Sequence, residues 1–161
     1  MKSLYILLAS IIVFSLHSCN GPDDSDRNDY PTIKNVKIGK RTGTLPDGKT
    51  APLFLFGDTL KFSADVADSH SLSGFILEVE YTETEKEGTR GWQYETDGDL
   101  LGRKEATVLV NDSIVPSSFT VNGTVYQTAQ GVYNLTFIVS DTVSLETKLT
   151  QKILIMEPPQ P

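Results

Sequence analysis

The sequence predicts an all-β protein, an immunoglobulin-like antiparallel β-sandwich of about seven to eight strands. Apolar residues alternate with polar ones along four long runs, at the period of two that is typical of half-buried strands. Turn-forming residues such as Asp97-Gly98-Asp99 separate the runs at short intervals. No segment repeats apolar residues at helical spacing over a helical length. Together these observations favour two packed antiparallel sheets.

The strands are expected in order at 33–38, 60–66, 75–81, 92–96, 106–110, 119–121, 133–139 and 149–155. Asn122-Gly123 is the residue pair that a type I′ turn prefers, so 119–121 and 124–126 should form a hairpin. The sequence holds one cysteine, so packing must hold the sheets together without an internal disulfide. The expected core comprises Val36, Leu60, Phe62, Val66, Leu77, Val79, Tyr133, Leu135, Phe137 and Ile153.

The N-terminus has the pattern of an export signal. Lys2 precedes an apolar run at 4–16, which is shorter than the roughly 18 to 20 residues that a membrane-spanning helix needs. Leu16, Ser18 and Cys19 resemble the lipobox of bacterial lipoproteins, with His17 departing from the usual small or apolar residue. The resemblance implies cleavage before Cys19 and its lipidation; the alternative is ordinary secretion with an incidental thiol.

Four segments follow from this interpretation. They are a lipoprotein signal peptide at 1–18, an acidic flexible tether at 19–30, the sandwich at 31–157 and a Pro-rich tail at 158–161. Asp23, Asp24 and Asp26 are similar to the acidic surface-export signal of Bacteroidota lipoproteins, or form a solvated linker. We expect a lipid-anchored protein of the outer membrane, at the cell surface or facing the periplasm.

Several segments resemble the uncharacterised single-domain lipoproteins of Bacteroidota that have a cadherin-like or immunoglobulin-like sandwich. These segments are 31–33, 56–60, 75–80, 131–137 and 139–141. Ser144 stands where the usual glycine of the turn after Ser140-Asp141 is expected. The resemblance implies the sandwich and an envelope address, and it implies no activity, because none is established for the group.

Composition argues against nucleic acid as a partner. The formal net charge is −7, and the basic residues are scattered singly or in pairs. We expect no enzyme and no cofactor: His70 lies in a polar loop, no G-x-S-x-G motif is present, and Glu78 and Glu80 lie on the polar face of a strand. We expect no resident metal either, although Asp68 and Asp141, each near a strand end, could form an adventitious calcium site.

Aromatic residues supply the best binding hypothesis. Trp92 and Tyr94 are two residues apart, so their rings project from one face of a strand, and Tyr81 is expected on the preceding strand. Such rings could stack against sugars or peptide groups. The alternative is that Trp92 fills the core, and its exposure distinguishes the two.

Three Asp-Ser/Thr motifs in the domain resemble the acceptor sequence of protein O-glycosylation in Bacteroidota. Their acceptors are Thr59, Ser113 and Thr142. The same residue pairs are also ordinary turn chemistry.

The sequence therefore predicts a non-enzymatic cell-envelope lipoprotein that acts in binding, adhesion or as an accessory subunit of an envelope complex. Its expected partners are the membrane, through the N-terminal lipid, and an envelope protein or glycan. Two alternatives stay open: a carbohydrate-binding protein or carbohydrate-active hydrolase on a sandwich, and a passive envelope component. The oligomeric state is left open.

Overall fold

The computed structural model describes residues 29–160, and its regular structure there is β-strand throughout. The strands are β1 (Thr32–Ile38), β2 (Arg41–Thr44), β3 (Thr50–Leu55), β4 (Phe62–Ala67), β5 (Leu72–Tyr81), β6 (Thr89–Arg90), β7 (Tyr94–Asp99), β8 (Glu105–Val110), β9 (Ser118–Val121), β10 (Thr124–Thr128), β11 (Gly131–Asp141) and β12 (Glu146–Met156). Within this part of the chain, no helix has the length and apolar character needed to cross a membrane.

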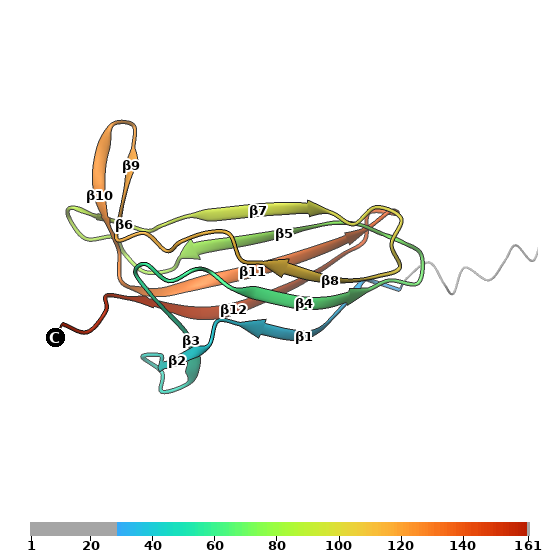
Figure 1. Ribbon diagram of the computed structural model, residues 1–161, viewed down its shortest axis with the longest axis horizontal. Coiled ribbons are helices and arrows are strands. Elements are labelled where there is room, and N and C mark those ends of the chain that lie inside the picture. The colour runs from blue at the N-terminus through green and yellow to red at the C-terminus, as the bar shows by residue number, and fades with distance from the viewer. Residues whose placement is uncertain (1–28, 161) are drawn as a thin grey trace, which may run out of the picture.

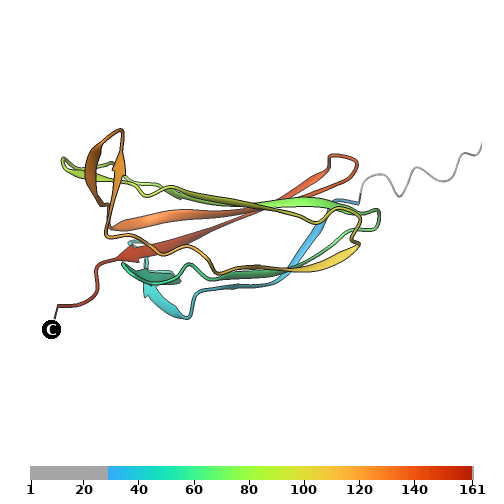
Figure 2. The same ribbon diagram turned by 45° about the horizontal axis from the view of Figure 1, so that its top comes forward.

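Two sheets face each other and form the sandwich (Figures 1 and 2). One has six strands in the order β2-β3-β12-β11-β5-β7, and the other has three in the order β1-β4-β8. The β5-β11 and β11-β12 pairs are long and antiparallel, whereas β3 runs parallel to β12. The all-β sandwich predicted from the sequence is therefore confirmed.

The core lies between the two sheets. Phe62 of β4 and Phe137 of β11 meet across the layers, with ring centroids 4.7 Å apart. Nine of the ten predicted core residues are buried, whereas Val36 is only half-buried and packs on the cluster from its edge. Because the period-two pattern sends alternate side chains to one face, these apolar residues meet without any cross-link.

A third, smaller sheet has the order β6-β10-β9, and Phe119 of β9 packs against the core cluster of the sandwich. Its hairpin is the one predicted: Val121 pairs with Thr124, and Asn122 and Gly123 have φ of 49° and 80°, as a type I′ turn requires. Figure 1 shows this hairpin projecting at the end of the sandwich opposite to the one where the described chain begins.

The structure has more strands than the seven or eight expected. The segments β2, β3 and β6 have no counterpart in the prediction, and β7 begins at Tyr94, so Trp92 precedes the strand instead of opening it. The short strands 41–44 and 89–90 show no alternation long enough to detect, which explains why the sequence pattern missed them. The signal peptide, Cys19 and all of the tether before residue 29 lie outside the described residues.

Candidate functional site

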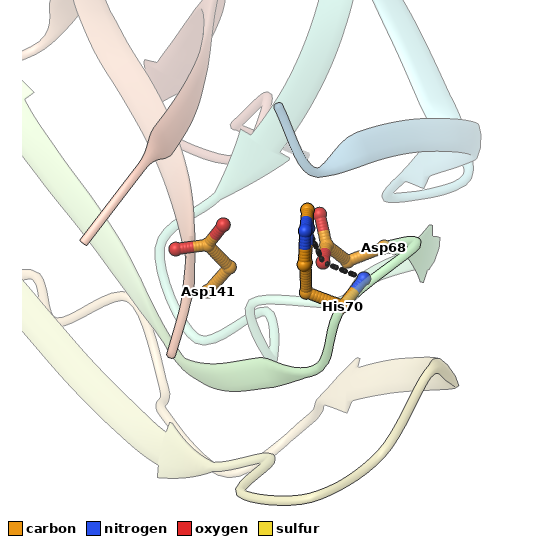
Figure 3. A group of neighbouring side chains, drawn as sticks. All are labelled: Asp68, His70 and Asp141. Atoms are coloured by element: carbon orange, nitrogen blue, oxygen red, sulfur yellow. Dashed lines mark hydrogen bonds and ion pairs between the residues drawn. The ribbon is translucent and has the colours of Figure 1, made fainter. Parts of the chain in front are cut away.

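Three potential metal ligands converge at the end of the sandwich where the described chain begins (Figure 3). Asp68 directly follows β4, His70 lies in the loop between β4 and β5, and Asp141 ends β11. One ligand atom from each of the three side chains lies within 4.8 Å of the others. The two sheets thus each contribute a carboxylate to a single cluster.

Asx turns hold both carboxylates in place. Oδ1 of Asp68 accepts a hydrogen bond of 2.7 Å from the backbone N–H of His70. Oδ1 of Asp141 accepts two, of 2.9 Å from Val143 and 2.7 Å from Leu145. Aspartate at the start of a turn favours this local bonding, so the sequence itself fixes one oxygen of each carboxylate.

A backbone bond joins the two loops. The N–H of Thr142 donates to the carbonyl oxygen of Ser71 at 2.9 Å. This bond ties the turn after β11 to the loop before β5, and it brings Asp141 toward His70. The cluster is therefore a product of the sheet topology as well as of the two turns.

The second oxygen of each carboxylate is buried without a partner. Asp68 is 8% exposed and Asp141 is 3% exposed. Oδ2 of each has no hydrogen-bond partner among the residues that the structure describes. Nδ1 of His70 lies 3.8 Å from Oδ1 of Asp68 and 3.3 Å from the hydroxyl of Ser69. A buried, unpaired carboxylate oxygen is unfavourable, so this arrangement is suited to receiving a cation.

Sequence reasoning singled out Asp68 and Asp141 because each stands near a strand end. It placed His70 in a polar loop without joining it to the pair. The signal that could have joined them is the spacing of Asp68-Ser69-His70, which lets an Asx turn hold the imidazole beside the carboxylate.

The aromatic residues of the binding hypothesis do come together, but in the core. Trp92 is 7% exposed and belongs to the core cluster, and its ring stacks on Tyr94 with centroids 5.6 Å apart. Tyr81 and Tyr94 are half-buried against the same cluster. The structure thus gives Trp92 the core position that the sequence had left as an alternative, and its ring offers little surface to a ligand.

The acidic residues required by the hydrolase alternative lie away from Trp92. In β5, Leu77 and Val79 face the core, so Glu78 and Glu80 project to the outer face. On the neighbouring strand β7, Glu95 pairs with Glu78, and Asp97 pairs with Ile76. Ile76 and Glu78 are two residues apart on β5, so Asp97 lies on the same outer face as Glu78. The acids and the indole therefore do not converge on a shared cleft.

The three Asp-Ser/Thr motifs are spread over two places. Thr59 and Ser113 are half-buried, and their segments lie side by side, with the N–H of Leu60 donating to the carbonyl oxygen of Ser113 at 2.7 Å. Thr142 is exposed, in the turn next to Asp141. It is the most accessible of the three hydroxyls to a modifying enzyme.

A second surface feature is the projecting β9-β10 hairpin. Residues 113–130 contain no charged side chain, although 22% of the whole chain is charged. Val125 is 65% exposed, and the guanidinium carbon of Arg90 lies 5.6 Å from the ring centroid of Tyr126. Strand β9 pairs with β10 alone among the described strands, so its outer edge is open.

Comparison with known proteins gives a family and a distant structural likeness. The model of the family described as a domain of unknown function (DUF4625) matches residues 17–156. A search of curated proteins finds no match. The structure is similar to a β-glucosidase from Listeria innocua in complex with isofagomine, with a TM-score of 0.45 and 13% identity, covering 83% of this chain and 17% of that chain. It is also similar to a mutant of the Listeria innocua β-glucosidase in complex with laminaribiose, with a TM-score of 0.42 and 11% identity over 78% of this chain and 16% of that chain. The chain thus spans less than a fifth of the length of either enzyme.

Proposed function

This chain belongs to the DUF4625 family of domains of unknown function, and from that premise we propose that it is a non-enzymatic binding module of the cell envelope. In this proposal a lipid on Cys19 anchors the protein to the outer membrane. The β9-β10 hairpin then captures an envelope protein. The passive and carbohydrate-related alternatives are outcomes of the experiment below.

The position of the hairpin relative to the start of the described chain supports the proposal. The described chain begins at Asp29, a short way after Cys19 in the sequence, and the hairpin lies at the opposite end of the sandwich (Figure 1). A lipid at Cys19 would leave the hairpin at the end of the domain away from its anchor. Extracellular sandwiches commonly use the loops at one end for recognition.

The single observation that carries the proposal is the uncharged, open surface of the hairpin. Edge strands are normally protected by charged side chains or proline, and β9 contains neither. Val125 adds an exposed apolar side chain on the neighbouring strand. A partner protein could therefore add a strand at β9 and bury Val125 in the same contact.

A pull-down from intact envelopes tests the hairpin. We expect the wild type to enrich one protein, and Val125→Asp to lose it. Leu109→Asp is the matched control, because Leu109 is 73% exposed on β8, in the β1-β4-β8 sheet, and should retain the partner. Loss in both variants, or in neither, would contradict docking at the hairpin.

A glycan array run in parallel separates the remaining alternatives. Glycan binding that Val125→Asp abolishes would replace the protein partner with a carbohydrate. The absence of a bound protein in the pull-down and of glycan binding on the array would favour a passive envelope component and would overturn the binding function.

Anchoring has a test of its own. Mass spectrometry of the native protein should find an acylated N-terminal Cys19, and Cys19→Ser should release the protein from the membrane fraction. An unmodified thiol at Cys19, or an N-terminus elsewhere, would contradict lipid anchoring to the outer membrane.

A further inference from the structure

We propose that Asp68, His70 and Asp141 bind one divalent transition-metal ion of the Zn²⁺ type. The proposal goes beyond the binding function and does not depend on it, because β4 and β11 end, beside the cluster, at the opposite end of the sandwich from the hairpin (Figure 1).

Two independent observations carry the inference. The first is convergence: one ligand atom from each side chain lies within 4.8 Å of the other two. The second is the pair of buried oxygens, Oδ2 of Asp68 and Oδ2 of Asp141, which have no hydrogen-bond partner among the residues that the structure describes. A bound cation would satisfy both oxygens and offset their charges, whereas without one the folded protein holds two desolvated carboxylates side by side.

The separation fits a small ion after a modest adjustment. Ligands of a tetrahedral Zn²⁺ ion at about 2.0–2.2 Å stand about 3.4 Å apart, so the three atoms need to close by little more than an ångström. His70 can supply this movement, because its side chain is 31% exposed and lies in a loop. The Asx turns hold Oδ1 of each aspartate, and the Oδ2 atoms have no hydrogen-bond partner among the described residues that an ion would have to displace.

The donor set selects the metal. Two carboxylates and one imidazole suit Zn²⁺ and its first-row neighbours, whereas Ca²⁺ and Mg²⁺ take oxygen ligands almost exclusively. The adventitious calcium site considered from Asp68 and Asp141 alone is therefore replaced by a mixed nitrogen and oxygen site. Three protein ligands leave a position for water or for a group from outside the protein.

Binding would join the two sheets at the end of the sandwich where the described chain begins. Asp68 follows β4 of one sheet, and Asp141 ends β11 of the other. The ion would therefore bridge the layers at the end of the sandwich where the hydroxyl of Thr147, on β12, also donates a hydrogen bond to the carbonyl oxygen of Pro31, just before β1. We infer that the ion stiffens this end of the domain.

Titration of the metal-free protein with Zn²⁺ tests the site. Calorimetry should give one ion per chain, and the melting temperature should rise by roughly 5–10 °C at a Zn²⁺ concentration 100 times Kd. Mg²⁺ at the same concentration should leave the melting temperature unchanged. Absence of a Zn²⁺-dependent shift in the wild type would overturn the proposal.

Asparagine substitutions isolate the ligand oxygens. Asp141→Asn keeps an acceptor for Val143 and Leu145 but replaces the unpaired oxygen, so the turn should fold while Zn²⁺ affinity falls by at least about 100-fold. His70→Gln should reduce affinity similarly, without loss of stability in the absence of metal. The matched control is Asp99→Asn, because Asp99 forms the same kind of turn with Leu101 but is exposed.

The control decides between the specific site and adventitious binding. Asp99→Asn should bind Zn²⁺ as the wild type does. Equal affinity in Asp141→Asn, His70→Gln and the wild type would show binding elsewhere on the acidic surface and would overturn the assignment.

Discussion

The hydroxyl of Tyr133 donates a 2.6 Å hydrogen bond to the carbonyl oxygen of Ala129, four residues earlier in the chain. Tyr133 lies near the start of β11 and is fully buried. The same hydroxyl oxygen accepts a bond of 3.4 Å from the backbone N–H of Trp92. This geometry resembles the tyrosine corner of immunoglobulin-like sandwiches, in which a tyrosine on a central strand anchors the chain that enters it.

Replacement of Tyr133 by phenylalanine should destabilise the fold by about 1–3 kcal/mol. The substitution keeps the ring and leaves the carbonyl of Ala129 without its partner in a buried position. Urea denaturation measures the change. The comparison is Tyr126→Phe on the projecting hairpin, which should change stability by less than about 0.5 kcal/mol. Equal effects of the two substitutions would show that the hydroxyl of Tyr133 contributes nothing to stability beyond the packing of its ring.

The same tyrosine predicts a loss of stability in alkali. Burial raises the pKa of the Tyr133 hydroxyl from its ordinary value of 10.0 to about 12. Because the folded state holds the proton more tightly, this stabilisation is fully present below pH 10 and is lost as the pH rises through the interval from 10 to 12. The difference amounts to about 2–3 kcal/mol.

Comparison with Tyr133→Phe isolates this contribution, since phenylalanine does not titrate. Burial also raises the pKa of Tyr94 to about 12, and that contribution is common to both proteins. Denaturation midpoints at pH 8, 10 and 11.5 should therefore fall more steeply in the wild type than in Tyr133→Phe. Parallel slopes would rule out Tyr133 as the titrating group.

Packing without a disulfide makes the centre of the core sensitive to cavities. Leu135 is fully buried between β5 and β12, so Leu135→Ala should cost about 2–5 kcal/mol. The matched substitution is Leu109→Ala, at a leucine that is 73% exposed, which should cost less than about 0.5 kcal/mol. Guanidinium denaturation of both variants measures the contrast. A small effect at Leu135 would mean that the two sheets do not depend on this layer.

The sequence was most informative where a strand is long and half-buried. Alternation along 75–81 and 133–139 predicted β5 and β11 because each alternate side chain reaches the same core. It failed at β3, where Leu53, Phe54 and Leu55 follow one another without alternation. That strand pairs antiparallel with β2 on one side and parallel with β12 on the other, and no local pattern encodes the pairing with β12, about a hundred residues away.

The site was predictable only in part, for the same reason. The positions of Asp68 and Asp141 at strand ends are visible in the sequence, but their meeting depends on β4 and β11 lying in opposite layers. Trp92 shows the converse limit. Its spacing from Tyr94 placed both rings on one face, and only the tertiary structure decides whether that face is the core or the surface.

The turn after β11 contains a residue whose backbone favours glycine. Ser144 has a φ of 69°, in the left-handed region, at the position where a glycine was expected from the sequence. The two bonds from Val143 and Leu145 to Oδ1 of Asp141 hold the turn in this conformation. A side chain there costs about 1–2 kcal/mol, whereas glycine has no such strain but loses about 0.5–1 kcal/mol more chain entropy on folding.

Ser144→Gly should therefore stabilise the protein, by about 0.5–1 kcal/mol. Ser144 is exposed, so the loss of its hydroxyl should have little effect. Thermal denaturation of Ser144→Gly and Ser144→Ala tests the cause: alanine keeps the Cβ and should give no gain. A gain with alanine would point to the hydroxyl instead of the backbone. A loss with glycine would mean that flexibility in this turn outweighs the strain that Asp141 imposes.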